Sequence, residues 1–116
     1  MLLITKTHVY CANAGDSRSV ISQKGQAIEL SEDHKPDLPT ERSRVIQAGH
    51  IVEDGRVDGI IAISRAIGDW EYKSKNLEPQ KMAVSSFPEV RVFDIDSKLD
   101  FIICACDGIW DCMTSQ

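Results

Sequence analysis

Two aspartates near the C-terminal end of the chain have the type and spacing of a cation site. Asp107 follows the apolar run 101–106, and Asp111 lies four residues later. The run predicts a strand ending at Asp107-Gly108, where glycine allows a ligand to approach the backbone closely. If residues 109–113 form a helical turn, both carboxylates lie on one face and repel each other unless a proton or cation separates them.

The absence of histidine or cysteine partners bears on which ion such a site would take. Carboxylates alone suit hard cations such as Mg²⁺, Mn²⁺ or Ca²⁺. The alternative is that Asp107 caps a helix and Asp111 is only solvated. The spacing by itself leaves both interpretations open.

Two other segments place charged side chains at predicted turns. In residues 13–18, NAGDSR, Asp16 and Arg18 project from a turn between apolar strands. The simpler interpretation is an Asp–Arg pair on a hairpin. In residues 63–69, ISRAIGD, Arg65 has a guanidinium that matches phosphate oxygens, although it could equally pair with Asp69.

The elements that must position these side chains are mostly short strands. The first four, expected to form an antiparallel meander, are Leu2–Ile4, His8–Asn13, Arg18–Ser22 and Gln26–Leu30. A helix is predicted from Pro39 to Ala48, with Gly49 as its left-handed stop. Further strands are predicted at 51–53, 56–57, 60–63, 82–85, 89–95 and 100–106. The last is apolar on both faces and is expected to be central.

Composition excludes several classes of function. The net charge of −5 and the lack of a basic cluster disfavour nucleic-acid binding. No apolar run reaches the ~20 residues that a membrane helix needs, and the opening MLLITKTHVY lacks the features of a signal peptide. The four cysteines match no zinc pattern, and we expect Cys104 and Cys106 to be small, buried and reduced. These features favour a cytoplasmic location, with the nucleus as a second compartment.

Six motifs together carry a resemblance that none carries alone. They are NAGDSR at 13–18, EDHKP at 32–36, E-x2-R-x-I-x-A-G at 41–49, ISRAIGD at 63–69, PEV at 88–90 and ACDGIWD at 105–111. In order and approximate spacing they resemble the protein phosphatase 2C family of metal-dependent serine/threonine phosphatases. The resemblance covers residues 13 to 111.

The resemblance implies a fold and a chemistry. The fold class is α+β, part of a four-layer α-β-β-α sandwich with two antiparallel sheets. The family uses Mg²⁺ or Mn²⁺, two ions with a third, weaker one, to activate a water that hydrolyses phosphoserine or phosphothreonine directly. Phosphoprotein substrates are therefore the expected partners, with neither nucleic acid nor membrane.

The resemblance also implies roles for individual residues. Asp107 matches an aspartate that binds a core metal, and Asp16 matches one that helps to hold the third metal. Asp111 matches a nearby acid of the same site. Arg65 lies in the segment beside the family's flap and is the candidate for engaging phosphate, whereas His34 is interpreted as structural.

Several family motifs are missing from the chain. The N-terminal arginine with its Glu-Asp pair, the Asp-Gly-His-Gly motif and the late Asp-Asn motif do not occur in it. Residues 1–116 are therefore predicted to be the central to C-terminal portion of one catalytic domain, truncated at both ends and weakly active or inactive alone. Its sheet edges would then be open to self-association. The alternative is a non-catalytic, phosphatase-like binding module. An aspartyl-nucleophile phosphatase fits poorly, because it would need Asp-x-Asp where this chain has Asp107-x3-Asp111, and none of the other five motifs fits it.

Overall fold

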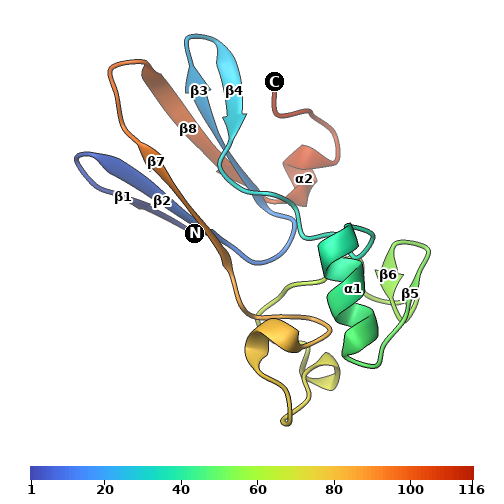
Figure 1. Ribbon diagram of the computed structural model, residues 1–116. Coiled ribbons are helices and arrows are strands. Elements are labelled where there is room, and N and C mark those ends of the chain that lie inside the picture. The colour runs from blue at the N-terminus through green and yellow to red at the C-terminus, as the bar shows by residue number, and fades with distance from the viewer. The chain divides into compact units, whose positions relative to one another are not determined.

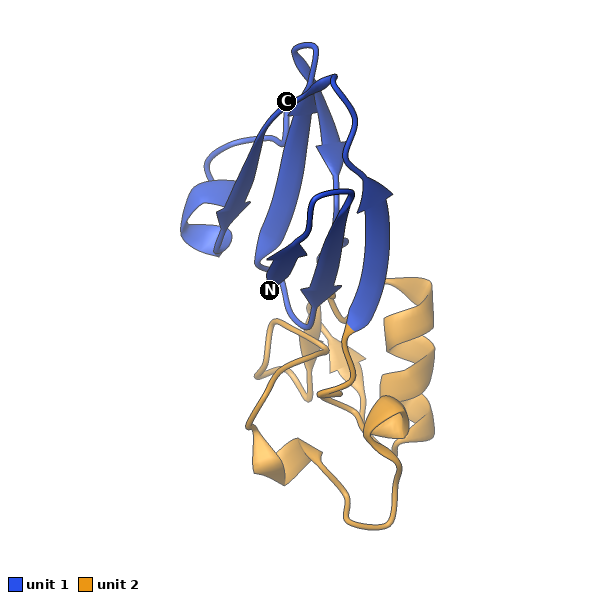
Figure 2. Cartoon of the chain, turned by 90° about the vertical axis from the view of Figure 1, so that its left-hand side faces the viewer, with its two compact units in different colours: residues 1–33, 89–116 blue, residues 34–88 orange.

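Short strands form two antiparallel sheets in the first of two compact units of the computed structural model, which describes residues 1–116 (Figures 1 and 2). This unit comprises residues 1–33 and 89–116. One sheet has the order β1 (Leu2–Ile4), β2 (His8–Asn13), β7 (Glu89–Asp94). The other has the order β4 (Gln26–Glu29), β3 (Arg18–Gln23), β8 (Leu99–Ala105). The predicted α+β class with two antiparallel sheets is confirmed.

The two sheets share one hydrophobic core. Val9 and Cys11 of β2 pack in a cluster with Ile21 of β3 and Leu30, and all four side chains are buried. Burying each large aliphatic side chain stabilises the folded state by about 1.5–3 kcal/mol. The inward faces of β2 and β3 therefore hold the sheets together as a sandwich.

The predicted meander over the first 30 residues is wrong at one connection. β2 and β3 belong to different sheets, and residues 14–17 carry the chain from one to the other. Gly15 has a φ of 124°, and the Asn13 side-chain amide donates to the carbonyl oxygens of Gly15 and Glu32. Alternating burial has the same period in a hairpin and in a sheet-to-sheet corner, so the sequence pattern could not separate them.

The expectation that the last strand is central is also wrong. β8 pairs with β3 alone and lies at the edge of its sheet, with Phe101 and Ile103 exposed. An apolar composition predicts that both faces of a strand are buried, but it does not predict whether the strand lies at the centre or at the edge of its sheet. Cys104 and Cys106 are likewise exposed rather than buried, although all four cysteines are free thiols.

The second unit, residues 34–88, is built around one helix. Helix α1 (Pro39–Gln47) begins with proline and carries an acidic residue in its first turn, both favourable there. It is followed by the hairpin of β5 (Val52–Glu53) and β6 (Arg56–Val57) and two 3-10 turns, Trp70–Tyr72 and Pro79–Lys81. Its core consists of Val45, Val57, Tyr72, Ala83 and Val84.

Two of the short strands expected in this unit do not form. Ile61 makes only an isolated bridge with Val57, and Ser85 makes one with Arg65. A single bridge leaves the neighbouring backbone free to follow side-chain packing instead.

No helix of the structure is long and apolar enough to cross a bilayer.

Gly49 ends α1 in the left-handed region, with a φ of 89°, and a Cβ there would meet no atom within 4 Å. Gly49→Ala should therefore lower the free energy of unfolding by about 1–2 kcal/mol through backbone strain alone. Urea denaturation followed by circular dichroism measures the change. Gly108→Ala is the control, because Gly108 has an ordinary φ. If Gly49→Ala were as stable as the native chain, a left-handed conformation of Gly49 at the end of α1 would be contradicted.

Candidate metal and phosphate sites

The register of β3 and β8 brings Asp16 and Asp107 to the same end of their sheet. Arg18 is paired with Ala105 at that end of the antiparallel ladder. Asp16 lies two residues before Arg18, and Asp107 lies two residues after Ala105. Asp16 is half-buried and Asp107 is exposed. Two segments far apart in the sequence thus present carboxylates from adjoining strand ends.

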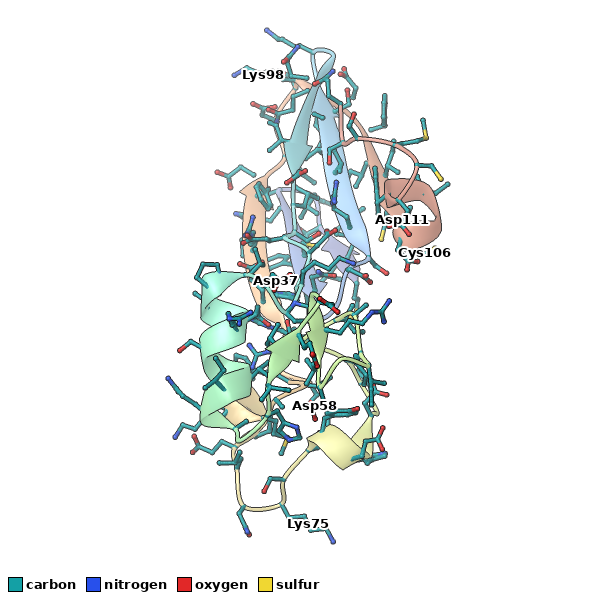
Figure 3. The ribbon with its side chains drawn as sticks, turned by 90° about the vertical axis from the view of Figure 1, so that its right-hand side faces the viewer. Asp37, Asp58, Lys75, Lys98, Cys106 and Asp111 are labelled. Carbon is teal, nitrogen blue, oxygen red and sulfur yellow. The ribbon has the colours of Figure 1, made fainter.

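Asp111 lies on the turn that follows. Helix α2 (Asp107–Trp110) begins directly after β8, and the Asp111 amide donates to the Asp107 carbonyl oxygen at 2.7 Å. The predicted helical turn is confirmed, and Figure 3 shows Asp111 beside α2, close to Cys106 at the start of that helix. Asp107 and Asp111 are both exposed and lie one helical turn apart.

The donor set fits a hard divalent cation in type but not in number. All three side chains are carboxylates, which suit Mg²⁺ or Mn²⁺. No group of three or more His, Cys, Asp or Glu residues in the chain is arranged to hold an ion by itself. Asp16, Asp107 and Asp111 therefore do not make a complete metal site by themselves.

Residues next to these carboxylates form a cluster that sequence reasoning missed. The Arg18 guanidinium binds Asp33 through two hydrogen bonds of 2.9 and 2.8 Å, and it lies over the Trp110 ring at 5.3 Å from the centroid. The Trp110 indole N–H lies 2.8 Å from the Ala105 carbonyl oxygen and 3.2 Å from that of Arg18. The hydrogen bond to Asp33 is the largest cause raising the pKa of Arg18. The tryptophan between the two aspartates was the only sequence signal.

Arg65 lies in the second unit, where it pairs with Glu41 rather than with Asp69. Its guanidinium makes contacts of 2.7 to 3.2 Å with both Glu41 carboxylate oxygens and donates to the Phe87 carbonyl oxygen at 3.2 Å. Asp69 adopts a left-handed conformation, with a φ of 50°, before the turn at Trp70. The structure therefore supplies Arg65 with a partner that spacing did not indicate.

Glu41 is the centre of a buried ionic network. Its side chain is 2% exposed and accepts hydrogen bonds from Arg65, from Arg44 at 2.7 Å and from the Ser64 hydroxyl at 2.5 Å. Burial by itself would raise the pKa of this carboxyl, but the bonds from Arg44, Arg65 and Ser64 outweigh burial and lower it to about 2. The i,i+3 spacing of Glu41 and Arg44 was the available sequence signal.

A pocket of about 450 Å³ adjoins this network, and we call it the Arg65 pocket. Arg44, Arg65 and Lys81 line it together with Glu41 and several polar residues. Three cationic groups face one carboxylate, so the balance of charge in the lining is positive. His34 adjoins this network through Ser64. It is 3% exposed, and its carbonyl oxygen accepts from the amide and hydroxyl of Ser64, whose hydroxyl also donates to Glu41.

Comparison with known proteins identifies the family. The model of the family Protein phosphatase 2C matches residues 1–116. Protein phosphatase 2C homolog 3 of Schizosaccharomyces pombe is 55% identical over 108 residues, which are 93% of this chain and 26% of that protein. Probable protein phosphatase 2C 60 of Arabidopsis thaliana is 50% identical over 115 residues, 98% of this chain and 32% of that protein.

Solved structures give the same result. A phosphatase from Toxoplasma gondii is 42% identical and superposes with a TM-score of 0.81, covering 90% of this chain and 32% of that one. A serine-threonine phosphatase 2C from the same organism is 25% identical with a TM-score of 0.83, covering 98% of this chain and 42% of that one.

The two-sheet fold is that of these protein phosphatases. The chain belongs to the protein phosphatase 2C family. It spans about a quarter to a third of the length of the curated relatives named above.

Replacing Glu41 with glutamine should destabilise the second unit by about 3 kcal/mol at pH 7, because two arginines would lose their shared carboxylate. The pKa of Glu41 is depressed from an ordinary 4.5 to about 2, so its contribution is complete above pH 4.5 and is lost as the pH falls toward 2. The difference between Glu41→Gln and the native chain should therefore narrow between pH 7 and pH 3 in urea denaturation.

Glu78→Gln provides the control for this experiment. Glu78 pairs with Lys81 at 3.1 Å, but its side chain is 62% exposed. Its loss should change the free energy of unfolding by less than about 1 kcal/mol. A pH-independent effect of Glu41→Gln, or an effect no larger than that of Glu78→Gln, would contradict the network.

Proposed function

We propose that the protein is a metal-dependent phosphatase acting on phosphoserine and phosphothreonine, and that residues 1–116 are the central to C-terminal portion of its single catalytic domain. The observation that carries the proposal is the β3–β8 register, which places Asp16 and Asp107 at one sheet end. Membership of the family supports the reaction class. Phosphoproteins are the proposed substrates.

The carboxylates of Asp16, Asp107 and Asp111 would hold the metal. Bound Mg²⁺ or Mn²⁺, two ions and a third weaker one in the complete site, supplies a water of lowered pKa and neutralises phosphate oxygens. The contribution of this chain is to hold acidic groups close together before the ion arrives. Their mutual repulsion is relieved when a cation binds, which favours occupancy.

Arg65 is proposed to engage phosphate from the Arg65 pocket. Two of its nitrogens are committed to Glu41, and the third donates to a backbone carbonyl. A guanidinium carries five N–H donors in a planar fork, so donors remain for an oxyanion. Glu41 also fixes the plane of this fork, which orients those donors.

Residues 1–116 alone are expected to turn over little substrate, because no three ligands in the chain are arranged to hold an ion. p-Nitrophenyl phosphate with Mn²⁺ is the direct assay. Vigorous turnover that a chelator abolishes would contradict the proposal that this portion is incomplete. The unpaired edge of β8 is proposed to favour self-association, which sedimentation measures.

Asp107→Asn should weaken Mn²⁺ binding to the chain by about tenfold or more, because an amide replaces a charged ligand. Electron paramagnetic resonance of free Mn²⁺ measures the affinity. Asp94→Asn is the control, since Asp94 lies in the same unit, at the end of β7, and is 88% exposed beside His8. Equal affinities for Asp107→Asn and the native chain would exclude Asp107 as a ligand and favour a non-catalytic binding module.

A further inference from the structure

Asp16 and Asp107 lie just beyond the paired ends of β3 and β8. Each carboxylate is two residues beyond the terminal pair of the ladder, Arg18 and Ala105. Two carboxylates at adjoining strand ends repel each other when no cation is present. The last pair of a strand ladder is also where fraying begins. The separation of the two carboxylates is therefore expected to depend on how rarely the Arg18–Ala105 pair frays.

The Trp110 side chain bridges that pair by hydrogen bonds from outside the sheet. Its indole N–H is shared between the carbonyl oxygens of Ala105, at 2.8 Å, and Arg18, at 3.2 Å. The same donor thus contacts the last residue of β8 and the first residue of β3. Trp110 also lies on α2, between Asp107 and Asp111, so this contact fixes the turn that carries both aspartates.

Arg18 holds Trp110 in place from its other side. Its guanidinium lies over the indole ring and donates two hydrogen bonds to the Asp33 carboxylate. Its remaining terminal nitrogen donates to the Ser115 hydroxyl at 2.8 Å. The neighbouring backbone is itself anchored, because the Ser19 amide donates to the Ser31 hydroxyl and the Leu30 amide donates to the Ser19 carbonyl oxygen.

The charge of Arg18 is already matched within this cluster. Asp33 lies at 2.8 Å from its guanidinium, and Glu29 lies at 3.6 Å. The side chains of Arg18 and Asp33 are 20% and 18% exposed, so the pair is shielded from solvent. All three guanidinium nitrogens of Arg18 are engaged inside the cluster, two by Asp33 and one by Ser115. Its contacts suit a mechanical role.

We propose that Asp33, Arg18 and Trp110 form a brace that positions Asp16 and Asp107 for a shared divalent cation without touching it. The inference rests on the proposed metal site. In this view the brace opposes repulsion between the carboxylates and keeps them close in the metal-free chain. None of the three brace residues is a ligand or a catalytic residue.

Trp110→Phe tests the brace, because it removes the N–H donor and keeps a ring face for Arg18. Mn²⁺ affinity, measured by electron paramagnetic resonance, should fall about tenfold, the lower end of the range for residues that orient metal ligands. Arg18→Lys should act in the same direction, because lysine cannot grip Asp33 through two bonds. The controls are Tyr10→Phe and Arg91→Lys, which make matched changes on the other sheet of the same unit.

Backbone order parameters from ¹⁵N relaxation separate positioning from general stability. In Trp110→Phe, amides of residues 16–18 and 105–107 should gain motion, while those of Ile21 and Ile102, within the same ladder, should not. A lower melting temperature with unchanged Mn²⁺ affinity would overturn the brace, as would unchanged order at the strand ends. If the native chain and Asp107→Asn bind Mn²⁺ equally, the metal site itself fails, and the brace loses its role with it.

Discussion

The antiparallel pairing of β3 with β8 is the constraint on which the candidate metal site depends. It joins segments about 80 residues apart in the chain and sets Arg18 opposite Ala105. Side chains alternate between the two faces of a strand, so a slip of one residue would turn Ile21 out of the shared core. The same slip would offset Asp16 from Asp107. Core packing therefore fixes the register, and the register sets which residues of β3 and β8 meet at the end of the ladder.

The ladder is irregular only at the end away from the aspartates. Its register shifts between Ser22 and Gln23, whereas the pairs from Arg18 to Ser22 are continuous. A bulge increases local twist and disrupts pairing. Because the bulge lies at the far end, pairing beside Asp16 and Asp107 stays regular. There the Trp110 indole N–H adds hydrogen bonds to both strands.

The second unit contains a buried, ionised carboxylate. Glu41 is almost fully buried yet ionised, because Arg44, Arg65 and Ser64 supply hydrogen bonds that offset its loss of hydration. The same bonds organise Arg65, so its guanidinium is held in one orientation. In the proposed function, the buried Glu41 carboxylate would orient Arg65 toward an anion, whereas in the first unit strand pairing would bring aspartates together for a cation.

Sequence reasoning located elements well where a local signal existed. Gly49, with proline at the start of the helix, delimited α1, and the Asp107-Gly108 break marked the end of β8. It failed where the answer depended on tertiary pairing. Alternation could not show that β2 and β3 lie in different sheets, and apolar composition could not show that β8 is an edge strand.

The site residues divide in the same way. Asp16, Asp107 and Asp111 were found from local chemistry and motif resemblance, and their metal role stays a prediction. The partners of Arg65 and Trp110 were not found, because Glu41 and Arg65 are 24 residues apart, and Trp110 reaches Arg18 across 92 residues. No local pattern encodes contacts of that kind.

The most direct test is paramagnetic broadening of amide signals by Mn²⁺ added below stoichiometry to the ¹⁵N-labelled chain. An ion shared by Asp16 and Asp107 should broaden residues 15–18 and 105–108 together and before all others. Broadening confined to one of these two segments, or appearing first around Asp54 and Asp58 in the second unit, would contradict the account.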